Sequence, residues 1–128
     1  MFMHIRKLPK KILMNSKFLL LGAFLFLCGH LCVFHQLNGQ FKWEWFKNNP
    51  HILALLGIPI SFFYIYGTKY AVQGFEGLLW PTRFLGFGIG MMVYAWGVSY
   101  YFNQGFTPKV VVSLILAFTL LSIQVLWK

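Results

Sequence analysis

The chain has 128 residues, of which 59% are hydrophobic, 20% aromatic and only 10% charged. An average soluble domain carries about 25% charged residues, so this composition excludes an ordinary water-soluble enzyme. Glu44 and Glu76 are the only acidic residues, which excludes a carboxylate dyad, a calcium loop and a two-metal site. The composition is typical of an integral membrane protein of one domain, with no enzymatic activity expected.

Residues 1–17 form a basic segment that precedes the first apolar run. Five of the eleven cations lie in it, and these are Arg6, Lys7, Lys10, Lys11 and Lys17. Cations in such a position attract the anionic headgroups of the cytoplasmic leaflet, each contributing about 1 kcal/mol. We therefore interpret residues 1–17 as a cytoplasmic segment that binds membrane lipids. No nucleic-acid partner is expected, because no basic and aromatic residues combine into a platform for it.

Four apolar stretches follow, at about residues 18–36, 52–70, 84–102 and 110–127. Each is close to the roughly 20 residues that a helix needs to cross about 30 Å of hydrocarbon. The stretches do not alternate between polar and apolar residues, as strands of a membrane barrel would. The sequence therefore predicts an all-α integral membrane protein, with a transmembrane domain of four helices over residues 18–128.

The distribution of cations predicts the orientation of these helices. If the helices alternate in direction, eight cations fall on one side of the membrane and three on the other. The smaller group is Lys42, Lys47 and Lys109, and the larger group joins the basic segment with Lys69, Arg83 and Lys128. The positive-inside rule then predicts a multi-pass protein with both termini in the cytoplasm.

The third stretch carries Gly86, Gly90 and Gly97 at spacings of four and seven, so the three glycines share one helix face. A strip of small residues lets another helix approach closely in lipid. We interpret this strip as a packing seam, either within one chain or between two copies. A substrate path along the strip is the alternative interpretation.

Pro59 lies inside the second stretch. Its ring removes one backbone hydrogen bond and is expected to kink the helix, leaving a carbonyl near Leu55 without its partner. Such a kink either opens a cavity or simply curves the helix for packing.

Arg83, Trp80 and His30 are the candidate residues for binding a substrate or a lipid headgroup. Arg83 lies where the third helix enters the membrane, so it can bind a phosphate, pair with Glu76 or serve as an ordinary interface anchor. His30 lies near the middle of the membrane, where ionisable side chains are uncommon and often functional. A neutral imidazole bonded to another helix is the simpler interpretation of His30, with Tyr64, Ser61 or Ser122 as the expected partner.

Cys28, Cys32 and His35 lie on one stripe of the first helix, close to His30. Three ligands from a single straight helix cannot surround a tetrahedral zinc ion, and no other membrane residue completes the set. We predict no metal site and no cofactor.

The two halves of the chain resemble one another weakly. Lys17–Gly22 and Arg83–Gly88 both begin with a cation followed by Phe, and both reach a Gly five places after the cation. This pattern favours two repeated helical hairpins in the same orientation, as in some transporters.

With these helix starts the chain resembles the GtrA-like family of four-helix membrane proteins, which is associated with moving lipid-linked sugars. The layout is also similar to that of small multidrug-resistance and drug/metabolite transporters, in which Trp80 and the glycines after it would belong to the third helix. The essential first-helix glutamate of the multidrug-resistance proteins has no counterpart here.

We therefore expect a transporter-like or flippase-like protein that is not proton-coupled through a buried carboxylate. It is expected to act as a homo-oligomer or beside a larger membrane partner. The alternatives are a non-catalytic accessory subunit or assembly factor of a membrane complex, and a holin-like pore former.

Overall fold

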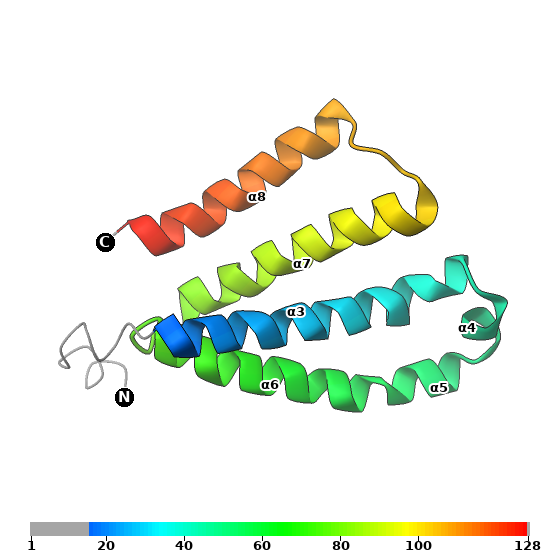
Figure 1. Cartoon of the computed structure of the whole chain (residues 1–128), viewed down its shortest axis with the longest axis horizontal. Helices are drawn as coiled ribbons and strands as arrows, with labels where there is room; N and C mark the ends of the chain where they lie inside the picture. The colour runs from blue at the N-terminus through cyan, green and yellow to red at the C-terminus, as the bar shows by residue number, and fades with distance from the viewer. Residues whose placement is uncertain (1–15, 128) are drawn as a thin grey trace.

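The computed structural model describes residues 16–127, and its regular elements are all helical (Figure 1). These elements are α3 (Ser16–Asn38), η1 (Gly39–Phe41), α4 (Glu44–Asn48), α5 (Pro50–Leu55), α6 (Gly57–Gly74), α7 (Leu79–Phe102) and α8 (Pro108–Leu126). The predicted all-α class is confirmed for this range. Of the basic N-terminal segment only Ser16 and Lys17 belong to the described residues, and Lys128 also lies outside them.

Three parts of the chain are long and apolar enough to cross a membrane: Ser16–Phe41, Pro50–Gly74 and Pro108–Leu126. Length and composition therefore support a membrane protein. Helix α7 has 24 residues, enough to cross about 30 Å of hydrocarbon. Its glycines, tyrosines and tryptophans lower its mean hydropathy, so α7 is not among the three segments that are apolar enough to cross a membrane. The fourth membrane span therefore stays a prediction.

The helical segments begin two to five residues before the predicted starts, with the second one beginning as the short helix α5. At two of these starts a proline is the first helical residue, Pro50 in α5 and Pro108 in α8. Proline suits this position because its missing N–H would have no partner there. The side chain of Thr107 caps α8 by accepting a hydrogen bond from the backbone N–H of Val110 at 3.3 Å.

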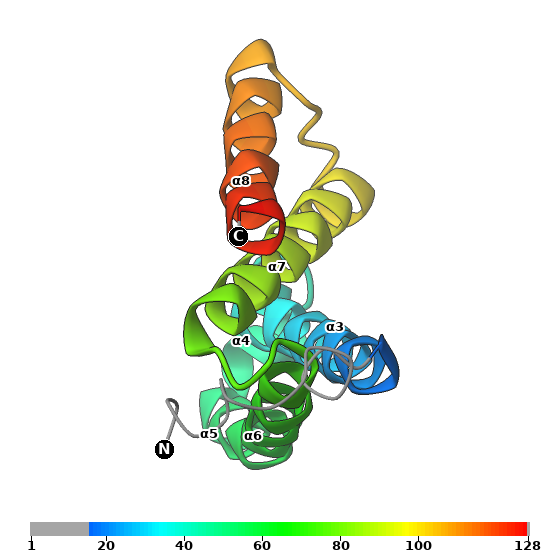
Figure 2. The same ribbon diagram turned by 90° about the vertical axis from the view of Figure 1, so that its left-hand side faces the viewer.

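The long helices form successive layers, with α3 between α6 and α7 and with α8 beyond α7 (Figures 1 and 2). They alternate in direction, so the start of α3, the α6–α7 turn and the end of α8 lie at one end of the molecule (Figure 1). We call this end, which carries Lys17 and Arg83, the α6–α7 end. At the opposite end lie α4, which contains Lys47, the start of α8, which contains Lys109, and the link between η1 and α4, which contains Lys42.

The closest backbone approach joins α3 to α6. A Cβ atom added to Gly22 would lie 2.7 Å from the backbone nitrogen of Ala71, and one added to Gly74 would lie 2.8 Å from the nitrogen of Leu19. Ala71 is completely buried. Small residues at these positions let the two helix backbones touch, which is how helices associate in lipid. We call Gly22, Ala71 and Gly74 the α3–α6 seam.

The second apolar stretch is interrupted at Leu56, between α5 and α6 and three residues before Pro59. Pro59 has no N–H with which to bond the carbonyl of Leu55. Next to the break, the side-chain amide of Gln36 donates a hydrogen bond of 2.8 Å to the carbonyl of Leu53. This bond links α3 to the last turn of α5, immediately before the break between α5 and α6.

Candidate functional site

A cavity of about 330 Å³ lies where α3, α6 and α7 meet. Its lining combines apolar groups with several polar side chains, and the residues are Phe26, His30, Tyr64, Thr68, Thr82, Arg83 and Gly86. We call it the His30–Arg83 cavity. It brings together two of the three candidate binding residues, although they are 53 positions apart in the chain.

His30 is held between two helices. Its Nδ1 lies 3.1 Å from the hydroxyl oxygen of Tyr64, one of the partners expected from the sequence, and the two rings meet edge to face. On the other side the imidazole fits against Gly90, where an added Cβ would lie 2.7 Å from the ring carbon Cε1. Any side chain at position 90 would therefore compete with the imidazole for space.

The glycine strip of α7 packs within the chain. Each of its three glycines faces a ring of α3: Gly86 faces Phe26, Gly90 faces His30 and Gly97 faces Phe34. These three rings recur every four residues along α3, so they project from one face of that helix. The strip accommodates side chains rather than a second backbone, unlike the α3–α6 seam.

Arg83 is the fifth residue of α7 and its side chain is exposed. Within residues 16–127 it forms no ion pair with Glu76, so the pairing considered from the sequence is absent there. Its neighbour Thr82 is only 3% exposed and its hydroxyl donates a hydrogen bond of 3.1 Å to the carbonyl of Leu78. The guanidinium thus keeps its hydrogen-bond donors available at the cavity.

Trp80 does not line the cavity. It is 70% exposed and its ring contacts that of Phe84, with 6.2 Å between the centroids. As the second residue of α7 it lies at the very end of the helix. This position suits an aromatic side chain at a membrane surface better than a group that binds a substrate inside the bundle.

The polar groups of the cavity extend from the α6–α7 end toward the middle of the helices. With a rise of 1.5 Å per residue, Arg83 lies about 6 Å from the start of α7 and His30 about 21 Å from the start of α3. A cation with hydroxyl and imidazole groups in a mostly apolar bundle can bind an anion that has left bulk water. The cavity is therefore suited to an anionic group.

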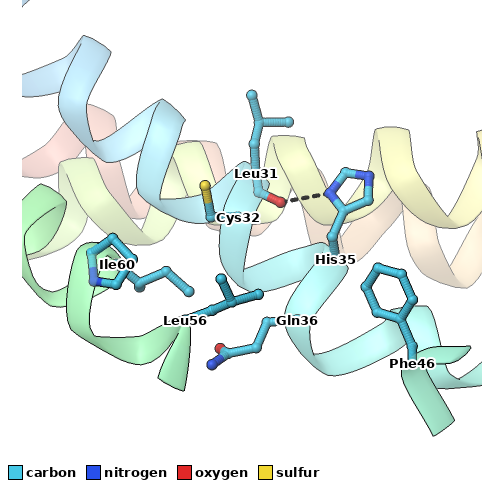
Figure 3. A pocket seen from close by; sticks show the side chains of 8 residues that line it. Leu31, Cys32, His35, Gln36, Phe46, Leu56 and Ile60 are labelled. Carbon is cyan, nitrogen blue, oxygen red and sulfur yellow. Dashed lines mark hydrogen bonds between the residues drawn. The ribbon is translucent and has the colours of Figure 1, made fainter. Parts of the chain in front are cut away.

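A second pocket, also of about 330 Å³, lies beside the Pro59 break, between α3, α4 and α6 (Figure 3). Its lining is almost entirely apolar and consists of Leu31, Cys32, His35, Gln36, Phe46, Leu56, Pro59 and Ile60. Its polar side chains are already bonded. His35 Nδ1 lies 2.7 Å from the carbonyl of Leu31, and its Nε2 lies 2.7 Å from the hydroxyl of Tyr101. This pocket has no charged group with which to recognise a polar ligand.

Residues 16–127 contain no cluster of three or more His, Cys, Asp or Glu side chains suited to a metal ion. His30 and His35, considered above as ligands, instead form hydrogen bonds with Tyr64 and Tyr101.

The sequence interpretation missed Thr68 and Thr82 as cavity residues. Thr68 follows Tyr64 by four residues on α6, so both side chains lie on the face that reaches the cavity. Thr82 immediately precedes Arg83 but is buried. The spacing of four residues between Tyr64 and Thr68 could have identified Thr68 as a cavity residue. That inference, however, requires knowing that His30 pairs with Tyr64.

No protein-family model, no curated protein and no solved structure matches this chain.

Proposed function

We propose that this protein is a transporter-like or flippase-like membrane protein that moves an amphiphile with an anionic headgroup between the leaflets. The observation that carries the proposal is the His30–Arg83 cavity. It places a cation and three hydroxyl-bearing side chains, those of Tyr64, Thr68 and Thr82, beside an imidazole between otherwise apolar helices. Polar and ionisable groups are costly inside a membrane and commonly mark the path of a substrate.

In this proposal α7 is the fourth membrane span. Its 24 residues correspond to about 36 Å, more than the hydrocarbon thickness. It packs between α3 and α8, both of which are apolar enough to span a membrane. The chain would then consist of two hairpins, α3 with α5–α6 and α7 with α8. Counted along the sequence with alternating helices, eight cations fall on the side where the first span begins and three on the other side, which favours a cytoplasmic location for both termini.

The cavity suggests how a headgroup would enter. Arg83 lies near the cytoplasmic end of the proposed span and would attract a headgroup there, while the acyl chains stay in the hydrocarbon. Thr68 and His30 lie further along the same cavity and would replace water around the headgroup. Glu44 lies in α4 and Glu76 in the α6–α7 turn, so no carboxylate lies within a long helix to carry a proton.

The proposal is tested with purified protein in liposomes that contain a fluorescent phosphatidylglycerol. Dithionite quenching from outside measures how much of the lipid exchanges between leaflets. We expect wild-type protein to accelerate exchange and Arg83→Gln to slow it about tenfold, since a charge-assisted hydrogen bond contributes about 1.5–3 kcal/mol. Lys69→Gln is the matched control, because Lys69 is a cation of α6 that contacts Tyr66 and Tyr70 and does not line the cavity.

Lys69→Gln should leave the exchange rate unchanged. Equal exchange with and without wild-type protein, or equal rates for Arg83→Gln and wild type, would contradict the proposed function.

A further inference from the structure

We propose that the apolar pocket between α3, α4 and α6 binds one acyl chain of a phospholipid. We call it the Pro59 pocket (Figure 3). It shares no residue with the His30–Arg83 cavity, so the site is separate from the one on which the proposed function depends. The proposal is carried by the shape of the pocket, by the chemistry of its lining and by its location between two segments that can cross a membrane.

The Pro59 pocket has a buried wall and an open mouth. Ile60, which forms part of the wall, is only 6% exposed. Cys32, Leu56 and Pro59 also line the pocket, and all three are exposed on the side of the helical bundle. The volume of about 330 Å³ lies within the range of ligand pockets, about 300–1,000 Å³. A flexible chain can therefore enter from the side of the bundle.

The space exists because α3 and α6 touch at one end and not beside the Pro59 break. An added Cβ at Gly22 would lie 2.7 Å from the backbone of Ala71, whereas the nearest atom to one at Gly57 is the side-chain nitrogen of Gln36 at 3.8 Å. The protein's own side chains leave the pocket unfilled. Atoms that line an empty space lose their dispersion contacts, so a molecule that fills the pocket is bound favourably.

The lining of the Pro59 pocket selects an apolar ligand. His35 uses both ring nitrogens, one with the carbonyl of Leu31 and one with the hydroxyl of Tyr101. The side-chain amide of Gln36 donates its hydrogen bond to the carbonyl of Leu53. The surface left to a ligand is almost entirely apolar, and a buried water needs about two to four polar partners. The pocket is therefore suited to hydrocarbon rather than to water or a polar molecule.

The location of the Pro59 pocket identifies the hydrocarbon as that of the membrane. Its α3 and α6 residues belong to Ser16–Phe41 and Pro50–Gly74, which are both long and apolar enough to cross a membrane. With a rise of 1.5 Å per residue, Cys32 lies about 24 Å along α3, toward the end that carries α4. In a membrane the mouth therefore opens to the acyl chains of the leaflet on the α4 side. Lipid chains are as apolar as the lining, so a chain gains packing contacts without leaving water.

The absence of charge in the lining favours a phospholipid over a free fatty acid. A fatty acid would bring its carboxylate close to the pocket, and the lining contains no Lys or Arg to pair with it. The headgroup of a phospholipid instead stays at the membrane surface while one of its chains occupies the pocket.

Photochemical labelling of the full chain in phosphatidylcholine vesicles tests the proposal. A small share of the phosphatidylcholine carries a diazirine in one acyl chain, and mass spectrometry locates the adducts after irradiation. Leu56 lines the pocket and is 43% exposed, whereas its neighbour Leu55 is 64% exposed and does not line it. We expect more adduct on Leu56 than on Leu55. Contact with bulk lipid alone would label the more exposed Leu55 more strongly, and that order or equal labelling would overturn the proposal.

The variant Cys32→Trp places a large side chain at the mouth of the pocket. We expect the excess of adduct on Leu56 over Leu55 to disappear in it. Leu27→Trp is the matched control, because Leu27 is also exposed on α3 and does not line the pocket. It should keep the wild-type excess. An excess that persists in Cys32→Trp, or that is lost equally in both variants, would overturn the proposal, while the wild-type comparison needs no substitution.

A fatty acid with the same diazirine chain, at equal concentration in the membrane, distinguishes the two sources of the chain. We expect it to give a smaller excess of adduct on Leu56 than the phospholipid does, and an equal or larger excess would overturn the assignment to a phospholipid. Labelling does not require lipid exchange between leaflets. Exchange that fails to respond to Arg83→Gln would therefore reject the proposed function alone, and equal labelling of Leu55 and Leu56 would reject this inference alone.

Discussion

Gly22→Ala is expected to destabilise the protein by about 2–3 kcal/mol, within the usual cost of overpacking. The added methyl group would lie 2.7 Å from the backbone nitrogen and 2.9 Å from the Cα of Ala71. Both atoms belong to the backbone of α6, so the contact is relieved only if the two helices move apart. That movement would loosen the α3–α6 seam along its length and with it the cavity that these helices enclose.

Gly57→Ala is the matched control for this prediction. Gly57 is also helical, but the nearest atom to its added methyl group is the side-chain nitrogen of Gln36 at 3.8 Å, an ordinary contact. Because alanine favours helix by about 1 kcal/mol over glycine, this variant should be as stable as wild type or slightly more stable. Unfolding in mixed detergent micelles by dodecyl sulfate, followed by circular dichroism, measures both. Equal stabilities of the two variants would refute the seam.

Phe34→Ala is expected to cost about 3 kcal/mol, at the lower end of the range for removing a buried aromatic ring. Phe34 is only 4% exposed, and its ring fits against Gly97 and packs with those of Tyr94 and Tyr101. Lipid tails are as apolar as the ring, so the cost arises from lost packing in the cavity left behind rather than from exposure to water.

The control for Phe34→Ala lies on the same helix. Phe24 is 59% exposed and would face lipid, so Phe24→Ala should change the free energy of unfolding by less than about 1 kcal/mol. The same unfolding measurement compares the two alanine variants. A loss of stability of similar size in both would mean that α3 does not pack against α7 through Phe34.

Much of the helical layout follows from the sequence because it depends on local properties. Apolar length determines where a helix can span a membrane, and Pro50 and Pro108 mark helix starts by their own geometry. The alternation of direction follows from short connections. These features need no knowledge of which helix packs against which.

The packing was harder to predict because it depends on pairs of helices. The glycines of α7 were recognised as a strip, but their partners are the rings of α3, and nothing in either segment alone specifies that match. The α3–α6 seam escaped notice because its small residues, Gly22, Ala71 and Gly74, are divided between two helices. Helix α6 carries Gly67, Ala71 and Gly74 along one face, but nothing in that helix alone specifies that they meet Gly22 and its neighbours on α3.

The candidate site was predicted in part for the same reason. Arg83 and His30 attract attention because charge and imidazole are rare in an apolar stretch, and both line the cavity. Trp80, the third candidate, lies at the exposed end of α7 and does not line the cavity. Thr68 carries no charge and becomes a candidate only through its position beside Tyr64.

The central claim is that α7 crosses the membrane and that the α6–α7 end, which carries Arg83, faces the cytoplasm. It is tested most directly by labelling single cysteines with a membrane-impermeant maleimide, in a chain with Cys28→Ser and Cys32→Ser. Glu76→Cys lies in the turn before α7, and Gly105→Cys lies after it at a position with no atom within 4 Å of an added Cβ. We predict that Gly105→Cys reacts in intact cells and Glu76→Cys only after permeabilisation; reaction of both from the same side would contradict the account.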